Sequence, residues 1–244
     1  MNHTIAAIST PAGSAGLGGV RLSGADAIAV AGRVFRPADP ARTVDKLEGY
    51  TAAYGHVYDP DGDVDECVAL VFRAPRSYTG EDVVELSIHG GGYLLQRTLR
   101  ACLAAGARPA GPGEFTRRAF MNGKMDLTQA ESVMGLIAAD GQLAARTALA
   151  AREGAVYRRL AGVQDALLGV AAQFGAYIDY PDEDIPDLSP AALAATVAEA
   201  SAAVEGLLST FDAGRVLREG IDTAIVGSPN VGKSTLMNCL AGCR

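Results

Sequence analysis

The stretch GSPNVGKSTLMNCLAG carries the clearest chemical signature in the sequence. Residues 227–234 match the pattern G-x-x-x-x-G-K-[ST], in which successive backbone N–H groups cradle phosphate oxygens. In this pattern Lys233 reaches the β- and γ-phosphates of a nucleotide, and the Ser234 hydroxyl ligates Mg²⁺. The alternative is a glycine-rich turn that happens to precede a helix. The match predicts a phosphate-binding loop.

The pattern also predicts the local structure around this loop. An apolar strand is expected over 223–226 and a helix over 235–240, and positive φ angles are expected at Gly227 and Gly232. A GTPase needs further segments for the base and the γ-phosphate, and these lie downstream of the first loop and helix. We therefore expect the loop to open a larger domain, and we look upstream for the chain's other chemistry.

Three charged residues upstream could hold a polar ligand. In GGVRLSG and DVVELSIHGG, Arg21 and Glu85 lie on the polar faces of two alternating strands. The glycines at 90–92 follow the second strand, so the backbone could approach a ligand closely there. Lys124 lies in a loop just before a helix. A solvated sheet face, a salt bridge and a surface lysine are the alternative interpretations.

The elements that must position these residues change in character near residue 120. Before it, short alternating segments separated by Gly and Pro predict a sheet with a few helices. The expected strands cover 4–9, 19–23, 51–58, 66–73 and 83–89. A helix is expected from Tyr93 to Ala105, ending at Gly106.

After residue 120 the apolar period becomes 3.6, which is typical of amphipathic helices. The expected helices cover 127–137, 156–178 and 193–207. Asp126 and Gln129 form a capping box before the first, and Ser189 with Pro190 begins the third. We expect the three to pack as a bundle.

Composition limits the classes of function. The net charge of the 244 residues is −7, which argues against a surface that coats nucleic acid generally. Four cysteines, Cys67, Cys102, Cys239 and Cys243, have no zinc-type spacing. No signal peptide, 20-residue apolar span or lipidation motif is evident, so we expect a cytoplasmic protein without a membrane partner.

Five motifs, in this order, resemble the tRNA-modification GTPase family MnmE, also called TrmE. They are TPAGSAGLGGVRLSG, SYTGEDVVELSIHGG, PGEFTRRAFMNGKMDLTQAE, IDYPDEDIPDLS and LREGIDTAIVGSPNVGKSTLMNCLAG. The resemblance implies a multidomain α+β protein. Residues 1–120 would form a folate-binding, homodimer-forming α/β domain similar to aminomethyltransferases. Residues 121–219 would be the first part of a helical domain and 220–244 the start of a Ras-like G domain, whose remainder would follow.

The resemblance also implies ligands and their residues. Tetrahydrofolate, as a 5-formyl or methylene derivative, would bind at Arg21, Glu85 and Lys124. GTP would bind at Asn230, Val231, Gly232, Lys233, Ser234 and Thr235, with K⁺ at Asn230 and Mg²⁺ at Ser234. No catalytic residue is expected within these 244 residues.

The implied function is modification at C5 of the wobble uridine (U34) of tRNA, by aminomethyl or carboxymethylaminomethyl addition with GTP hydrolysis. The flavoprotein MnmG would be the partner and tRNA the substrate. The alternative is a folate-binding, dimer-forming module without GTPase activity of its own. A lone aminomethyltransferase is a third interpretation, but it predicts no phosphate loop.

Several other residues have two interpretations. His89 could act as a general base, although a hydrogen-bonded histidine at a strand end is the more common case. Arg117 and Arg118 could contact tRNA phosphates or be exposed charges. Five carboxylates crowd the connector at 179–187, where solvation and the following helix explain them better than a metal does.

Overall fold

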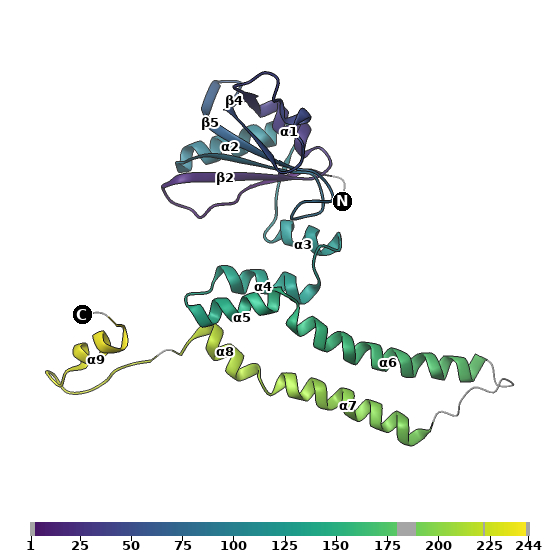
Figure 1. Ribbon diagram of the computed structural model, residues 1–244. Coiled ribbons are helices and arrows are strands. Elements are labelled where there is room, and N and C mark those ends of the chain that lie inside the picture. Colours follow the sequence, from purple (N-terminus) through teal and green to yellow (C-terminus); the bar gives the residue numbers. More distant parts are fainter. Residues whose placement is uncertain (1–2, 180–188, 222, 243–244) are drawn as a thin grey trace. The chain divides into compact units, whose positions relative to one another are not determined.

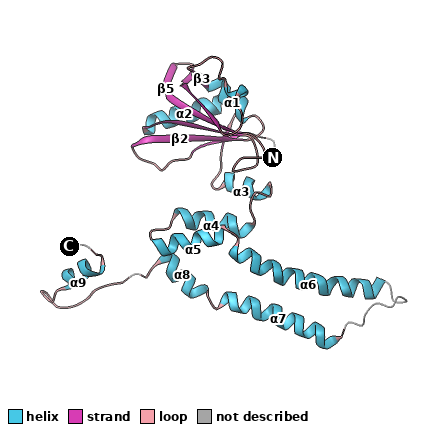
Figure 2. Cartoon of the chain, viewed as in Figure 1, coloured by secondary structure: helices cyan, strands magenta, loops and turns pink. Residues whose placement is uncertain are grey.

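The computed structural model describes residues 3–179, 189–221 and 223–242. The chain forms two compact units, one up to Ala130 and one from Glu131 onward, and each is described by itself (Figure 1). Figure 2 shows that the described strands all belong to the first unit, whereas the second is helical.

The first unit is built on a seven-stranded mixed sheet with the order β3-β4-β5-β6-β2-β1-β7. All neighbouring strands pair antiparallel except β1 and β7, which pair parallel. The strands are β1 (Ile5–Ile8), β2 (Ala15–Ser23), β3 (Phe35–Pro37), β4 (Thr51–Asp59), β5 (Gly62–Phe72), β6 (Val83–Gly90) and β7 (Arg108–Pro109). Segments far apart in sequence thus become neighbours, above all β2 and β6.

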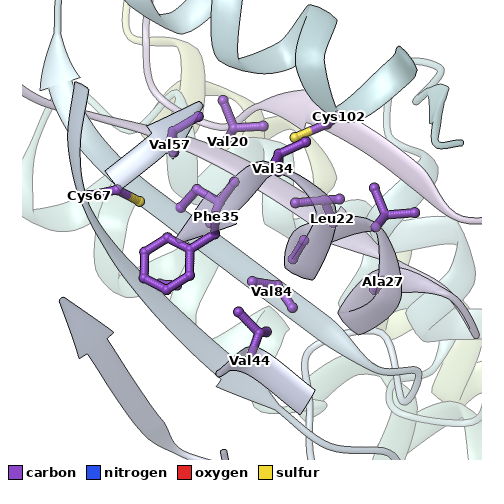
Figure 3. Close-up of a cluster of buried hydrophobic side chains, with 14 of the residues drawn as sticks. Val20, Leu22, Ala27, Val34, Phe35, Val44, Val57, Cys67, Val84 and Cys102 are labelled. Atoms are coloured by element: carbon purple, nitrogen blue, oxygen red, sulfur yellow. The ribbon is translucent and has the colours of Figure 1, made fainter. Parts of the chain in front are cut away.

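Helices α1 (Ala27–Val34) and α2 (Gly92–Ala104) pack on one face of this sheet and enclose the core. Val20 and Leu22 of β2 point into it with Val84 of β6 (Figure 3). Because these side chains alternate with polar ones, each strand buries one face only. Complete burial of one such aliphatic side chain contributes about 1.5–3 kcal/mol, which fixes the register of β2 against β6.

The other face of β2 and β6 carries the polar side chains, including Arg21 and Glu85. Two segments contact this face: the loop between β5 and β6, residues 73–82, and helix α3 (Glu114–Met121). We refer to the former as the 73–82 loop. A short 3₁₀ helix, Val44–Lys46, completes the unit.

All five expected strands are present, with small differences at their ends. β3 and β7 were not expected, because runs of two and three residues are too short to show a period. Gly90 has a structural reason other than a ligand: a Cβ there would lie 2.6 Å from the Ala15 carbonyl oxygen of β2. The hypothesis that the backbone approaches a ligand at Gly90 is therefore replaced by close strand packing.

The second unit consists of helices. Its elements are α4 (Leu127–Ile137), which crosses the boundary between the units, α5 (Gln142–Arg152), α6 (Ala155–Asp179), α7 (Pro190–Leu208) and α8 (Phe211–Glu219). Helix α6 packs along α7, and α5 contacts both α8 and α6. The capping box at α4 is confirmed: Asp126 Oδ1 accepts from the Gln129 N–H at 2.8 Å, and Gln129 Oε1 accepts from the Asp126 N–H at 2.9 Å.

The expected helices correspond to α4, α6 and α7, but α5 and α8 were missed. Helix α5 is rich in alanine and helix α8 is only nine residues long, so neither shows a strong apolar period. Among the described residues from 131 onward, only Ala144, Gly154 and Ala200 are buried. Large apolar side chains such as Phe174 and Leu208 are exposed on α6 and α7.

One described helical stretch, residues 190–216, is long and apolar enough by length and composition to cross a membrane, which differs from the expectation of no such span. Small alanine side chains supply much of its apolar character, and Glu199 and Glu205 interrupt it. The α7 part of this stretch packs along α6, and its α8 part contacts α5.

After α8 the described chain contains one helix, α9 (Lys233–Leu240). The expected strand over 223–226 is not formed. A strand is defined by hydrogen bonds to a neighbouring strand, and no described segment pairs with these residues. The apolar sequence is thus present without its sheet.

Candidate functional site

Arg21 and Glu85 meet on the polar face of the sheet. They are register partners on β2 and β6, and the Arg21 Nε and Nη2 atoms each lie 2.8 Å from Glu85 Oε1. Their side chains are 29% and 31% exposed, so the pair is half-buried and still reachable from solvent. Among the described residues, none donates a hydrogen bond to Glu85 Oε2, which leaves this oxygen open to a ligand.

Two aromatic rings flank the Arg21 guanidinium. Its Cζ atom lies 5.6 Å from the ring centre of Tyr78 in the 73–82 loop and 5.7 Å from that of Phe115 in α3. The Tyr78 hydroxyl is in turn 2.9 Å from the Thr116 hydroxyl. Each cation–π contact of this kind contributes about 0.5–2 kcal/mol. Arg21 is therefore held by a carboxylate and by two rings from different elements.

Lys124 lies after α3 and is attached to the same loop. Its Nζ donates to the Pro75 carbonyl oxygen at 3.0 Å. Gly80 has a φ of +77°, and a Cβ there would lie 3.3 Å from Lys124 Cγ, so the glycine makes room for the lysine stem. Within the described residues Lys124 makes no ion pair with Glu85; the 73–82 loop contacts both Lys124 and Arg21.

The 73–82 loop is fixed by a buried network of charges. Glu81 accepts from Arg118 Nη1 at 3.0 and 3.1 Å and from the Ser23 hydroxyl at 2.7 Å. The Thr79 hydroxyl lies 2.7 Å from that of Ser23, and the Thr79 carbonyl accepts from Asn122 Nδ2 at 2.7 Å. These bonds tie the loop to β2 and to the end of α3.

Arg118 is the centre of this network and is only 1% exposed. Its Nη2 donates to the His3 carbonyl at 2.9 Å and to Glu114 Oε1 at 3.1 Å. Both sequence interpretations of Arg118, a tRNA contact or an exposed charge, are therefore wrong, because the local sequence does not reveal that two carboxylates will bind the guanidinium. Arg117, its neighbour, is exposed.

The pKa of Glu114 reflects the same network. Burial favours its neutral form, but the Gly111 N–H at 2.8 Å, Arg118 and Arg108 outweigh that effect and hold the pKa of Glu114 below its ordinary value. The carboxylate is thus charged at neutral pH, and Arg118 is balanced by two negative partners.

His89 is bound rather than poised as a base. Its Nδ1 lies 2.9 Å from Asp65 Oδ1, and its backbone N–H donates to Asp65 Oδ2 at 2.8 Å. The hydrogen bond to Asp65 raises the pKa of His89.

The two described buried thiols are poor nucleophiles, because burial raises the pKa of Cys67 and of Cys102 to about 12.

The phosphate loop has one of the two expected backbone features. Gly232 has a φ of +84° and caps α9, but Gly227 does not have a positive φ, so that expectation is wrong. Asn230 adopts φ +60° instead, which asparagine tolerates better than most residues do. A Cβ at position 227 would lie 3.3 Å from Val231 Cγ2, a tight contact that a small shift of the exposed Val231 side chain would relieve.

Lys233 Nζ donates to the loop's own carbonyls, at 3.0 Å to Gly227 and 2.7 Å to Ser228. Ser234 and Asn230 are exposed, as is Val231. A hydroxyl and an amide oxygen fit the hard-cation preference of Mg²⁺ and K⁺, and the loop N–H groups fit phosphate. In the described part of the chain no group of three or more His, Cys, Asp or Glu side chains could hold a metal. The carboxylates at 182–187 and Cys243 lie outside the described residues.

Comparison with known proteins identifies the family of the chain. Residues 4–124 match the family model described as GTP-binding protein TrmE N-terminus, and residues 127–235 match that of the MnmE helical domain. The chain belongs to the MnmE (TrmE) family. The matched regions include all three charged residues of the Arg21 site and the whole phosphate loop.

Curated relatives from several bacteria are all named tRNA modification GTPase MnmE. That of Thermus thermophilus is 48% identical over an alignment of 244 positions, which covers 99% of this chain and 55% of the relative. Those of Chloroflexus aurantiacus and Geobacter metallireducens are 48% and 46% identical, over 98% of this chain and 52% of each relative. The chain therefore spans about half the length of the curated MnmE relatives it matches.

Sequence reasoning singled out the charges but missed what holds them in place. The motif SYTGEDVVELSIHGG contains Tyr78 and Glu81 beside Glu85, yet their contacts run to residues far along the chain. Phe115 and Arg118 lie in the motif PGEFTRRAFMNG, one helical turn apart, and no spacing rule connects them with β2. The tertiary pairing of the two MnmE motifs was the missing information.

Proposed function

We propose that the first unit binds a tetrahydrofolate, as a 5-formyl or methylene derivative, at Arg21, Glu85 and Lys124, and that this unit forms a homodimer. The observation that supports this most directly is the half-buried Arg21–Glu85 pair, which is flanked by two rings and has one unbonded carboxylate oxygen. Two cations that contact the same loop, one of them paired with a carboxylate, suit a ligand that carries both donor-rich and anionic groups.

The chemistry of a reduced folate matches these side chains. A carboxylate such as Glu85 can accept hydrogen bonds from the donor-rich edge of a pterin. Arg21 and Lys124 suit the glutamyl carboxylates or a polarised carbonyl. The bound folate supplies the one-carbon unit, and the side chains of the site bind and orient it.

In the whole protein we propose that this site serves modification at C5 of the tRNA wobble uridine, U34, by aminomethyl or carboxymethylaminomethyl addition. The flavoprotein MnmG is the proposed partner, tRNA the substrate and the cytoplasm the compartment. GTP binds residues 230–235, with Mg²⁺ at Ser234 and K⁺ at Asn230. Family membership supports this proposal, since the curated relatives are named tRNA modification GTPases.

The test is a calorimetric titration of the chain with 5-formyltetrahydrofolate, together with Arg21→Ala, Glu85→Ala and Lys124→Ala. Loss of one charge-assisted hydrogen bond weakens binding by about 1.5–3 kcal/mol, which is roughly 10- to 150-fold. The matched control is Arg36→Ala. Arg36 forms an ion pair with Asp63 at 2.6 Å elsewhere in the same unit, and its loss should leave the affinity unchanged.

Two results would contradict the folate site. One is a folded wild-type chain that does not bind the ligand; the other is binding that survives in all three variants. An alternative function is a folate-binding dimeric module without GTPase activity. The exposed phosphate loop favours it for this stretch of chain, and a full-length reading frame with D-x-x-G and N-K-x-D motifs would exclude it for the whole protein.

A further inference from the structure

We infer that Tyr78 is a positioning residue of the folate site, which holds the Arg21 guanidinium in the orientation that the ligand needs. This inference rests on the proposed function and adds a residue that the family resemblance does not assign. Tyr78 contacts Arg21 through its ring and Thr116 through its hydroxyl, so it connects the sheet with α3.

The geometry around Arg21 restricts its movement. Nε and Nη2 share one carboxylate oxygen of Glu85, which alone would permit the guanidinium to rotate about that contact. The rings of Tyr78 and Phe115, 5.6 and 5.7 Å from Cζ, limit this rotation. Removal of one ring would leave the charge in place and release its orientation.

The position of Tyr78 is set by buried bonds on both sides of it in the loop. Ser77 Oγ donates to the Glu81 carbonyl at 2.5 Å, and the Thr79 hydroxyl contacts Ser23 at 2.7 Å. Glu81 is then bound by the fully buried Arg118. A ring carried by a segment tied down in this way can hold its neighbour, whereas a ring on a free loop cannot.

A second arginine in the same unit provides the comparison. Arg36 lies 5.7 Å from the ring centre of Tyr58 and 2.6 Å from an Asp63 oxygen, which is the same pair of contacts. However, the Arg36 and Asp63 side chains are 57% and 52% exposed, and one ring faces Arg36 rather than two. Tyr58 is therefore a matched control with equal chemistry and no ligand site.

The experiment measures affinity for 5-formyltetrahydrofolate in Tyr78→Phe, Tyr78→Leu and Tyr58→Leu. Tyr78→Leu should weaken binding about tenfold, because it keeps an apolar side chain and loses the cation–π contact. Tyr78→Phe keeps the ring and should stay within about twofold of the wild type. Tyr58→Leu should not change the affinity. Urea unfolding of each variant separates these effects from a loss of folding.

A second measurement needs no ligand. The Arg21 Nε–H signal, followed by nuclear magnetic resonance in ¹⁵N-labelled protein, should exchange with water faster and change its chemical shift in Tyr78→Leu but not in Tyr58→Leu. An unchanged Arg21 signal overturns the inference. If the wild type binds and Arg21→Ala abolishes binding while Tyr78→Leu does not weaken it, the inference fails and the folate site stands. If the wild type does not bind, the folate site fails, and the inference fails with it.

Discussion

The Arg21 site and the phosphate loop differ in how the rest of the chain holds them. Arg21 is fixed by a carboxylate on the neighbouring strand and by two rings, and the 73–82 loop beside it is anchored by a buried arginine. In the phosphate loop, the partners of Lys233 among the described residues are carbonyls of its own loop, and no residue of α9 is buried.

The difference shows that a highly specific sequence motif does not guarantee that the rest of the chain holds the site in place. The loop has the more specific sequence pattern, because every fixed position of G-x-x-x-x-G-K-[ST] is present. The Arg21 site has no comparable pattern, yet its side chains are preorganised by neighbours from three elements. Preorganisation is what lets a site bind without a further ordering cost.

The largest expected effect concerns the anchor of the 73–82 loop. Arg118→Met removes a buried cation and leaves the Glu81 and Glu114 carboxylates without this shared partner, so the free energy of unfolding should fall by about 3–5 kcal/mol. Urea unfolding measures it. The matched control is Arg117→Met, an exposed neighbour on α3 whose loss should stay within about 0.5 kcal/mol. Equal stabilities of the two variants would show that the buried charges do not hold the loop.

A second prediction compares the two sites directly. With Mg²⁺ present, the chain should bind GTP at least about 100-fold more weakly than 5-formyltetrahydrofolate, a difference of about 2.7 kcal/mol. The reason is that the loop's phosphate contacts remain exposed to water and Lys233 is already bonded. Parallel calorimetric titrations test it, with Lys233→Ala as a variant that should weaken GTP binding further and leave the affinity for 5-formyltetrahydrofolate unchanged. Tight, Mg²⁺-dependent GTP binding that Lys233→Ala abolishes would end the contrast between the two sites.

A third prediction concerns acid. Because the folded-state pKa of Glu114 lies below its ordinary value of 4.5, its charge stabilises the fold above that value, and the stabilisation is lost as the pH falls through the folded-state pKa. Glu114→Gln should lower the free energy of unfolding at pH 7 by about 1.5–3 kcal/mol. It should also flatten the decrease in stability at pH 4.5 and below. If urea unfolding shows that the free energy of unfolding falls equally steeply with decreasing pH in the wild type and in Glu114→Gln, this carboxylate does not have the proposed role.

The sequence predicted elements with a strong local signal and missed contacts that depend on distant partners. Alternation located β2 and β6, and an apolar period of 3.6 located α6 and α7. The pairing that brings Arg21 to Glu85 spans 64 residues, and no local pattern encodes it. The three charges were singled out from strand faces and a loop, and the resemblance added their ligand, whereas the roles of Tyr78 and Phe115 and the burial of Arg118 became visible only in the fold.

The same reasoning explains the errors at the phosphate loop. The expected strand over 223–226 depends on a neighbouring strand, which the described residues do not supply. The expected positive φ at Gly227 confused two uses of glycine. At Gly232 the backbone adopts the left-handed conformation, whereas Gly227 has no positive φ and a Cβ there would only come into tight contact with the Val231 side chain. Only three-dimensional contacts distinguish the two uses.

The smallest expected effect separates a bound histidine from a catalytic one. Asp65, with a smaller contribution from Glu66, raises the pKa of His89 above 6.5, so protonated His89 stabilises the fold below that pH and the effect is lost as the pH rises through the folded-state pKa. The His89 side chain is 64% exposed, which keeps this contribution to stability small. Titration of its ring protons by nuclear magnetic resonance should give a pKa above 6.5 in the wild type and a lower one in Asp65→Asn.

Affinity for 5-formyltetrahydrofolate should not follow this titration, because His89 is bonded to Asp65 and makes no contact with the Arg21–Glu85 pair among the described residues. An affinity that does follow it would extend the folate site along β6 to His89, and the comparison would then be between a larger site and the same exposed loop.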